Sequence, residues 1–332
     1  MACIVCDITA LQVLRSIGVS GALEYGNVSP LEAKLPTRLV LESARCTGAE
    51  LARLDGLVRM GVCTPPYHVL VGPANRVSSR GDLICHEWSG PYTDGAFLVV
   101  SDGLYVCAPA LCLAQLAGRS TRVSDGSLLK LAYEFCGSYT PDRSASTGTV
   151  ERPPLATPAL LGDRAWQLGR YRGAARVRSL AAHVLPGSKS PMESCQSILL
   201  NLPCSRGGYG LRACGPTLNP RIDLAVRSRL TGRSYYMPDL LYPKAKLAIE
   251  YKGRHHLDPR SAEIDERRRN EFTALGYEVV TVTWEQLVDD GTFDAIARAI
   301  ARKLGHRIRP RDVVRFVARR LSLRRELFGR AK

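Results

Sequence analysis

Two acidic residues and a lysine, placed around a short polar turn, constrain this chain more than any other feature. Asp239 precedes the turn 243–246, and Glu250 and Lys252 follow it. If the turn joins two antiparallel strands, Asp239 and Glu250 face each other with Cβ atoms roughly 5 Å apart. Lys252 then projects from the same face of the sheet as Glu250, because side chains alternate along a strand. The spacing predicts a β-hairpin that gathers two carboxylates and an amine.

Each of these three side chains has a chemical role open to it. Carboxylate oxygens are the ligands that Mg²⁺ prefers, and Glu250 ends an apolar run at 247–249 where an unpaired carboxylate would be costly to bury. Asp239 and Glu250 are therefore the predicted metal ligands. Lys252 would orient the attacking water or stabilise charge on a phosphate. The alternative is an ion pair between Lys252 and one of the two acids, without catalysis.

The hairpin and the residues around it resemble the PD-(D/E)xK nuclease superfamily. The stretch 236–256, the charged helix expected over 262–275, the strand expected over 277–283 and Trp284 look like the branch of very-short-patch-repair endonucleases. The resemblance covers about residues 188–305. It implies a restriction-endonuclease-like core, a mixed sheet flanked by helices in the order α-β-β-β-α-β. It also implies a DNA endonuclease that depends on Mg²⁺, with Mn²⁺ as a substitute ion.

The resemblance adds two further candidates to the site. It implies that Glu193 approaches the metal from the first core helix. Ser190 and Glu193 are also spaced as a capping box with Pro191 at the first helical position, and a capping role needs no catalysis. It also implies that histidines just after the hairpin lie near the active site. His256, preferred over His255, would then act as a general base or acid, and the other is a loop residue.

The positive charge lies in the half of the chain that carries this motif. Residues 1–150 contain 12 Lys/Arg against 13 Asp/Glu, whereas residues 151–332 contain 34 against 18. A basic domain attracts phosphate backbones through the release of counterions. DNA is therefore the predicted partner. The residues expected to contact it are arginines after the hairpin and in the C-terminal tail: Arg254, Arg268, Arg269, Arg315 and Arg319.

The tail 307–332 combines ten Lys/Arg and two acids with apolar residues at helical spacing. This predicts a basic amphipathic helix with three interpretations: it packs on the core along DNA, lies on a membrane surface, or is a solvated end.

No apolar run is long enough to span a membrane, and the N-terminus does not resemble a signal peptide. Eleven scattered cysteines, with Cys3 and Cys6 the only close pair, favour reduced and mostly buried thiols in a cytoplasmic protein.

The sequence of the N-terminal half predicts a smaller α/β domain over residues 1–137. Expected strands cover 67–71, 83–87 and 96–100, and expected helices cover 49–60, 108–117 and 128–135. The stretch 102–117 is similar to the central part of abortive-infection-type antitoxin regulators. Those proteins often begin with a DNA-binding winged helix, which the first 60 residues do not show. This half is therefore expected to bind a protein partner or to pack against the other domain.

The predicted organisation has four parts. After the domain over 1–137 comes a Ser/Thr/Pro-rich linker at 138–162, then a nuclease-like domain at 163–306 and the helix at 307–332. The leading functional prediction is a metal-dependent endonuclease. A DNA-binding regulator that uses an inactive nuclease core as a scaffold is the second, because a fold does not guarantee activity. An interaction module that binds RNA is the third.

Overall fold

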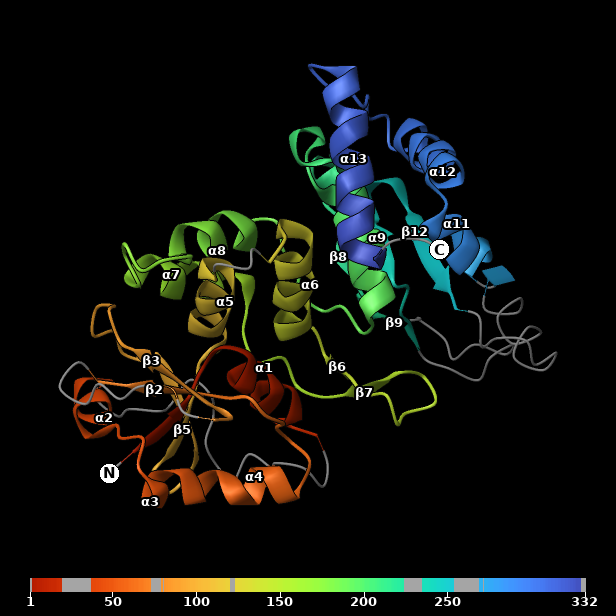
Figure 1. Ribbon diagram of the computed structural model, residues 1–332. Helices are drawn as coiled ribbons and strands as arrows, with labels where there is room; N and C mark the ends of the chain where they lie inside the picture. Colours follow the sequence, from red (N-terminus) through yellow and green to blue (C-terminus); the bar gives the residue numbers. More distant parts are fainter. Residues whose placement is uncertain are drawn as a thin grey trace. The chain divides into compact units, whose positions relative to one another are not determined.

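The computed structural model describes residues 2–19, 37–72, 79, 81–119, 123–223, 235–253, 269–270 and 272–329. The chain forms two compact units (Figure 1). The N-terminal unit comprises Met1–Ser124 and Ser138–Ala182, and the C-terminal unit comprises Asp125–Gly137 and His183–Lys332. Both units combine helices with mixed sheets, which confirms the α/β class expected from the sequence.

The two units divide the chain differently from the predicted domains. Helix α6 (Asp125–Cys136), expected in the first domain, packs in the C-terminal unit. Helices α7 (Pro158–Gln167) and α8 (Ala174–Ala181) pack in the N-terminal unit, although the residues from 163 onward were assigned to the nuclease-like domain. The expected linker contains a hairpin of β6 (Tyr139–Pro141) and β7 (Thr149–Glu151). Composition alone does not distinguish a hairpin from a linker, since both are rich in Ser, Thr and Pro.

The N-terminal unit is built on a five-stranded sheet in the order β3-β2-β1-β5-β4. The central strand β1 runs parallel to β5 and antiparallel to β2, and β2 runs parallel to β3. The strands are β1 (Cys3–Val5), β2 (Tyr67–Val71), β3 (Leu83–Glu87), β4 (Phe97–Ser101) and β5 (Leu104–Cys107). Strands β2 and β3 match the predicted bounds. The sequence did not indicate β1, which is only three residues long.

Helices cover both faces of this sheet (Figure 1). Helices α1 (Asp7–Ser16) and α5 (Pro109–Gly118) pack together on one face, and α3 (Gly48–Leu51) and α4 (Asp55–Arg59) lie on the other. The helix expected over 49–60 is therefore interrupted, by a 3-10 turn at Ala52–Leu54. A further helix, α2 (Thr37–Ser43), precedes them. Val5 and Cys6 at the end of β1 are completely buried, so the start of α1 lies deep in the unit.

The C-terminal unit contains a four-stranded sheet in the order β13-β12-β11-β8. Strand β11 is antiparallel to both β8 and β12, whereas β12 and β13 are parallel. Parallel neighbours need a crossover connection, and residues 269–270 and 272–274 between them are helical. The strands are β8 (Thr217–Leu218), β11 (Leu240–Tyr242), β12 (Leu247–Lys252) and β13 (Glu278–Thr283), with β9 (Ile222–Asp223) and β10 (Tyr235–Tyr236) forming a separate pair.

Helices pack on this sheet from both sides. Helix α9 (Pro191–Asn201) lies on one face, where the Tyr242 hydroxyl donates a hydrogen bond of 3.1 Å to Asn201 Oδ1. Phe272 packs on the opposite face with Leu241 and Ala248. The remaining helices are α11 (Trp284–Val288), α12 (Asp290–Lys303) and α13 (Val313–Phe328). Among the described residues, no helix is both long and apolar enough to cross a membrane.

The cysteines are free thiols and most of them are buried, as the sequence predicts. Burial raises the pKa of Cys3 to about 12 and raises that of Cys6 as well, so both stay protonated and unreactive at neutral pH. These two residues belong to the core around β1. Their spacing reflects a short buried strand.

Candidate active site

The predicted hairpin is present and its register is the expected one. Strands β11 and β12 pair with Leu240 opposite Ile249. Asp239 is a bend residue just before β11, and extending the register by one residue would set it opposite Glu250 on the same face of the sheet. Lys252 lies on that face too, because it is two residues beyond Glu250. The register therefore places Glu250 and Lys252 on one face and is compatible with the grouping expected from the sequence.

The turn between the strands explains why this register is held. Residues Pro243–Ala245 form a single 3-10 turn, and Lys246 closes it in the left-handed conformation with φ +47°. The turn is exposed, whereas residues 247–249 are completely buried. Both faces of the sheet are covered here, so a slip of one residue would bring charged Lys246 or Glu250 into a fully buried position. The hydrophobic run therefore fixes the position of Glu250.

The half-buried Asp239 is held by backbone groups on both sides. Its Oδ2 accepts a hydrogen bond of 2.8 Å from the Tyr251 N–H, and its carbonyl oxygen accepts one of 3.0 Å from the Asn219 N–H. The first bond ties the Asp239 carboxylate to the strand that carries Glu250. The second ties the Asp239 backbone to the segment that follows β8.

Glu250 is oriented by a tyrosine that the sequence analysis did not select. The Tyr236 hydroxyl donates a hydrogen bond of 2.7 Å to Glu250 Oε1. The Tyr236 ring stacks on Phe272 at a centroid distance of 3.8 Å, and Phe272 stacks on Tyr277 at 4.1 Å. This column of three rings attaches the helix after the hairpin to the face that carries Glu250. Packing of that helix is therefore coupled to the orientation of a site carboxylate.

Glu193 is both a helix-capping residue and a neighbour of the hairpin. Its backbone N–H donates to Ser190 Oγ at 3.2 Å, as the capping pattern predicts, while its Oε2 accepts from the Lys189 N–H at 2.9 Å. The same oxygen accepts a hydrogen bond of 2.7 Å from Asn219 Nδ2. Asn219 thus links the Glu193 carboxylate to the Asp239 backbone. Burial raises the pKa of Glu193.

The carboxylates of this site are not gathered into a tight three-ligand group. Within the described parts of the chain, one group of three His, Cys, Asp or Glu residues has ligand atoms all within 4.8 Å, and it belongs to the N-terminal unit. The donor set at the hairpin nevertheless fits Mg²⁺. That ion keeps several waters and is commonly held by one or two carboxylates. Asp239 and Glu250 supply two on one face of the sheet.

The other predicted site residues fall into two groups. Arg254, His255, His256 and Arg268 lie outside the residues that the structure describes. Arg269 is a half-buried residue of the helical segment after the hairpin, and Arg315 and Arg319 are exposed on α13. Arg319 Nη1 also donates to the Ser205 carbonyl oxygen. Two of the five proposed DNA contacts are therefore exposed on one helix.

Helix α13 packs on the C-terminal unit with its apolar residues and with two arginines. Phe316, Leu323 and Leu327 are buried. Arg320 is also buried, and it pairs with Asp290 at 2.7 Å and with Asp294. The predicted apolar stripe is only partly used, since Val313 and Leu321 are exposed. The expectation that the tail forms a helix packed on the core is confirmed.

Sequence reasoning missed two sets of polar residues. Asn219 and Tyr236 carry no motif, and their roles depend on contacts made far along the chain. Asp7, His68 and His86 form the three-ligand group of the N-terminal unit. Their only signal was a histidine inside each of two expected strands, and the strand order that unites them is not readable from the sequence.

Comparison of the chain with protein-family models, with curated proteins and with solved structures found no match. The geometry of its own residues is therefore the basis for inferring what it does.

Proposed function

We propose that the C-terminal unit is a metal-dependent endonuclease that hydrolyses DNA phosphodiester bonds. The observation that carries this proposal is the hairpin register, which, extended by one residue, would set Asp239 opposite Glu250 with Lys252 on the same face. The element order supports a restriction-endonuclease-like core. Helix α9 is followed by the antiparallel strands β8, β11 and β12, then by a helical segment and by β13 parallel to β12.

The residues have distinct roles in this proposal. Asp239 and Glu250 would hold Mg²⁺ or Mn²⁺, which when bound activates water and offsets charge that develops on the phosphate. Lys252 orients the nucleophile or stabilises the same charge. The Tyr251 N–H and the Tyr236 hydroxyl hold the two carboxylates in place through the hydrogen bonds described above. A fixed orientation of ligands matters because a small displacement of reacting groups slows catalysis strongly.

Glu193 takes a supporting part. Burial raises its pKa and so favours the protonated form, which is able to donate as well as accept a hydrogen bond. Through Asn219 it is linked to the Asp239 backbone. We therefore assign Glu193 to the site as a residue that positions Asp239 or donates a proton near it.

The substrate class follows from charge. The excess of basic residues lies in residues 151–332, and the arginines exposed on α13 offer contacts to phosphates. Such contacts hold the backbone without reading base sequence. Residues 183–332, which belong to the same unit as the hairpin, contain 28 Lys/Arg against 16 Asp/Glu, and this excess supports the predicted DNA partner.

The proposal is tested by nicking of supercoiled plasmid in Mg²⁺ or Mn²⁺. Glu250→Gln and Lys252→Ala should each lower the rate by about 100-fold or more, as loss of a catalytic group does. Glu278→Gln and Lys244→Ala are matched controls, since both residues are exposed in the same sheet or its turn. They should cleave like the wild type. Absence of nicking by the wild type with either ion, or equal rates for all variants, would overturn the assignment.

A DNA-binding regulator is the second candidate, and one observation favours it. Glu193, Asp239 and Glu250 do not converge within 4.8 Å of one another, in contrast to the ligands of the N-terminal group. A core of this kind is able to serve as a scaffold for binding alone. Retained plasmid binding by the wild type, with no cleavage by any variant, would identify this function.

A further inference from the structure

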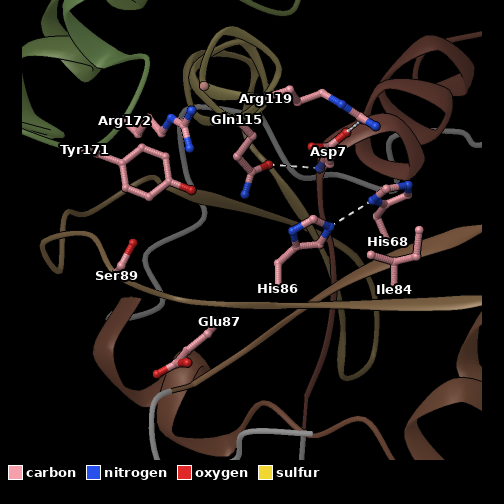
Figure 2. A pocket seen from close by; sticks show the side chains of 11 residues that line it. Asp7, His68, Ile84, His86, Glu87, Ser89, Gln115, Arg119, Tyr171 and Arg172 are labelled. Atoms are coloured by element: carbon pink, nitrogen blue, oxygen red, sulfur yellow. Dashed lines mark hydrogen bonds and ion pairs between the residues drawn. The ribbon is translucent and has the colours of Figure 1, made fainter. Parts of the chain in front are cut away.

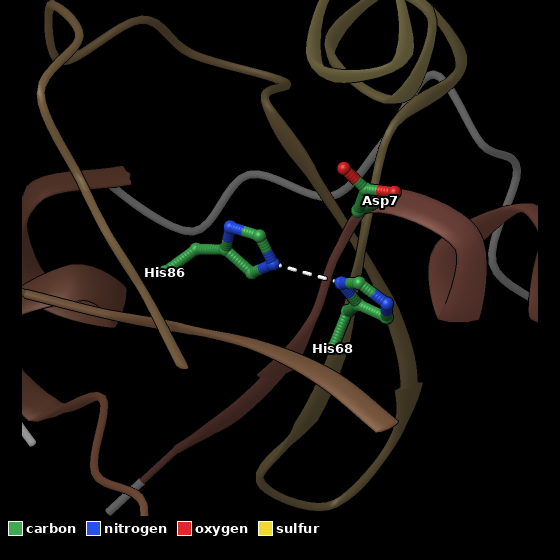
Figure 3. A group of neighbouring side chains, drawn as sticks. All are labelled: Asp7, His68 and His86. Atoms are coloured by element: carbon green, nitrogen blue, oxygen red, sulfur yellow. Dashed lines mark hydrogen bonds between the residues drawn. The ribbon is translucent and has the colours of Figure 1, made fainter. Parts of the chain in front are cut away.

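A second cluster of polar side chains lies in the N-terminal unit, at the meeting point of three elements (Figure 2, Figure 3). Asp7 is the first residue of α1, directly after β1, while His68 lies on β2 and His86 on β3. The parallel register of β2 and β3 places Leu70 opposite His86, so the two histidines share one face of the sheet. Three ligand-type side chains thus converge from separate parts of the chain.

The distances within the cluster suit a small ion. One ligand atom from each of Asp7, His68 and His86 lies within 4.8 Å of the others. His68 Nδ1 and His86 Nε2 are 2.8 Å apart, which is a hydrogen bond that a single proton bridges. Two nitrogens bound tetrahedrally to one Zn²⁺ are about 3.4 Å apart, given bonds of about 2.0–2.1 Å. A separation of the rings by about 0.6 Å would therefore let an ion replace the shared proton.

Two of the three residues are buried, and hydrogen bonds orient Asp7. Asp7 is 4% exposed and His68 is 3% exposed. The Asp7 N–H donates to Gln115 Oε1 at 2.9 Å, and Asp7 Oδ1 accepts from the Ile8 N–H at 2.7 Å and pairs with Arg119. No described residue donates to its other oxygen, Oδ2. Hydrogen bonds of this kind fix the geometry of metal ligands.

The state of the two rings and the shape of their surroundings support binding. Burial lowers the pKa of both His68 and His86, which keeps them neutral at physiological pH, and neutral imidazole is the form that binds metals. The cluster lines a cavity of about 500 Å³ together with Arg119, Tyr171 and Arg172 (Figure 2). This volume is in the range of ordinary ligand pockets. Coordination positions not filled by protein could therefore be filled by water or a small ligand.

We propose that the N-terminal unit binds one divalent transition-metal ion through Asp7, His68 and His86. Two imidazoles with one carboxylate favour Zn²⁺, Fe²⁺ and similar ions over Mg²⁺ and Ca²⁺, which prefer oxygen ligands. The Arg119 guanidinium pairs with Asp7 Oδ1, so Oδ2 remains for the ion. The positive charge of Arg119 would also favour an anion or hydroxide bound beside the metal. The site is separate from the hairpin of the C-terminal unit, so it does not depend on the nuclease proposal.

The test measures zinc bound by the full-length protein after dialysis against Zn²⁺ with a large excess of Mg²⁺, which occupies oxygen-only sites. The wild type should retain one Zn²⁺ per chain. His86→Gln and Asp7→Asn should each weaken Zn²⁺ binding by at least about tenfold, because each removes one of three ligands. Asn tolerates the left-handed backbone of Asp7, whose φ is +52°, and its side-chain oxygen can still accept from the Ile8 N–H, although the charge that pairs with Arg119 is lost. His306→Gln, a partly exposed histidine of the C-terminal unit, is the matched control and should bind like the wild type.

Co²⁺ in place of Zn²⁺ separates this site from the cysteines. The visible spectrum should show nitrogen and oxygen ligands without a thiolate charge-transfer band, and it should disappear in His86→Gln. Three results would overturn the proposal. The wild type could retain no Zn²⁺, the variants His86→Gln and Asp7→Asn could retain as much Zn²⁺ as the wild type, or the Co²⁺ spectrum could show a thiolate band. The first of these would identify the cluster as a hydrogen-bonded pair of histidines beside an ion pair.

Discussion

Asn219 connects two acids that lie far apart in the sequence. Its backbone N–H donates to the Asp239 carbonyl oxygen, and its side-chain amide donates to Glu193 and to the Gly187 carbonyl oxygen. The backbone of Asn219 is left-handed, with φ +46°, and asparagine is one of the few residues other than glycine that adopt this conformation at low cost. One residue thereby fixes the spacing between helix α9 and the hairpin.

The hydroxyl of Tyr236 offers a test of how Glu250 is held. Tyr236→Phe keeps the ring stacked on Phe272 and removes only the donor to Glu250 Oε1. A hydrogen bond to a charged group contributes about 1.5–3 kcal/mol, so we expect plasmid nicking to slow by about tenfold or more. Tyr277→Phe is the control, because Tyr277 stacks on the other side of Phe272. Equal nicking rates for Tyr236→Phe and the wild type would show that the hydroxyl does not orient the site.

The raised pKa of Glu193 predicts how the stability of the protein depends on pH. Because burial raises its pKa above the ordinary 4.5, the folded state binds the proton more tightly than the unfolded state. The free energy of unfolding therefore falls as pH rises from about 4.5 through the raised pKa. Glu193→Gln retains an oxygen that can accept from Lys189 and Asn219 but does not titrate. The variant should lose this part of the pH dependence and be at least as stable as the wild type at pH 7.

Urea unfolding of both proteins between pH 4.5 and pH 8 provides the measurement. The informative quantity is the difference in unfolding free energy between wild type and variant, since other groups titrate equally in both. A difference that stays constant across this range would contradict the raised pKa. Loss of nicking in the stable variant would in addition support a role for Glu193 in the site.

At the level of elements, helix α13 shows how a basic segment divides its arginines between structure and surface. Arg320 and Arg324 are buried against Asp290, with distances of 2.7 Å and 3.5 Å. Arg315 and Arg319 project into solvent. The helix begins at an N-cap, Asp312, whose side chain accepts from the Arg315 N–H. Arg315, Arg319 and Arg325 are the exposed arginines of this helix and are available to phosphates.

This division predicts opposite effects for two substitutions on α13. Arg320→Ala removes the buried guanidinium that pairs with both Asp290 and Asp294, and breaking a buried pair costs about 3–5 kcal/mol of stability. Arg315→Ala removes an exposed side chain and should change stability by no more than about 0.5 kcal/mol. Chemical denaturation measures both. Equal stability of the two variants would mean that Arg320 is not a structural residue.

The predicted elements were most accurate where the signal is local. Strands β2 and β3 and the hairpin of β11 and β12 follow from alternating apolar residues and a polar turn. The arginine-rich stretch 163–183 has the composition of one basic helix, but it does not form a single helix. The chain instead forms α7 and α8, separated by Gly169 and Gly173, both with positive φ. Glycine adopts such conformations freely, and a helical apolar pattern on either side does not reveal them.

For the molecule as a whole, the distribution of charge leads to a prediction about DNA binding. Release of counterions makes affinity fall steeply with salt, and Arg315 and Arg319 are each expected to contribute one phosphate contact. The affinity for a labelled duplex should fall at least about tenfold between about 50 and about 200 mM NaCl. The double variant Arg315→Ala, Arg319→Ala should reduce the slope of log affinity against log salt by about 2. Fluorescence anisotropy measures both quantities, and an unchanged slope would exclude α13 from the interface.

The two units differ in the chemistry of their candidate sites. The C-terminal unit presents carboxylates and a lysine, which suit a hard ion such as Mg²⁺, whereas the N-terminal unit presents imidazoles with one carboxylate. The two proposals can therefore fail separately. Each unit also contains its own buried core, so effects of a variant on one site are measurable while the other remains intact.

The hairpin with Asp239, Glu250 and Lys252 was determined by the sequence alone, because alternation and turn chemistry act over a few neighbouring residues. The capping of α9 by Ser190 was determined in the same way. Only the tertiary structure decided that Asn219 joins Glu193 to Asp239, that Arg320 is buried while Arg315 is not, and that Asp7 meets two histidines. These contacts depend on strand order and helix packing, which bring together residues whose separation in the chain carries no periodic signal.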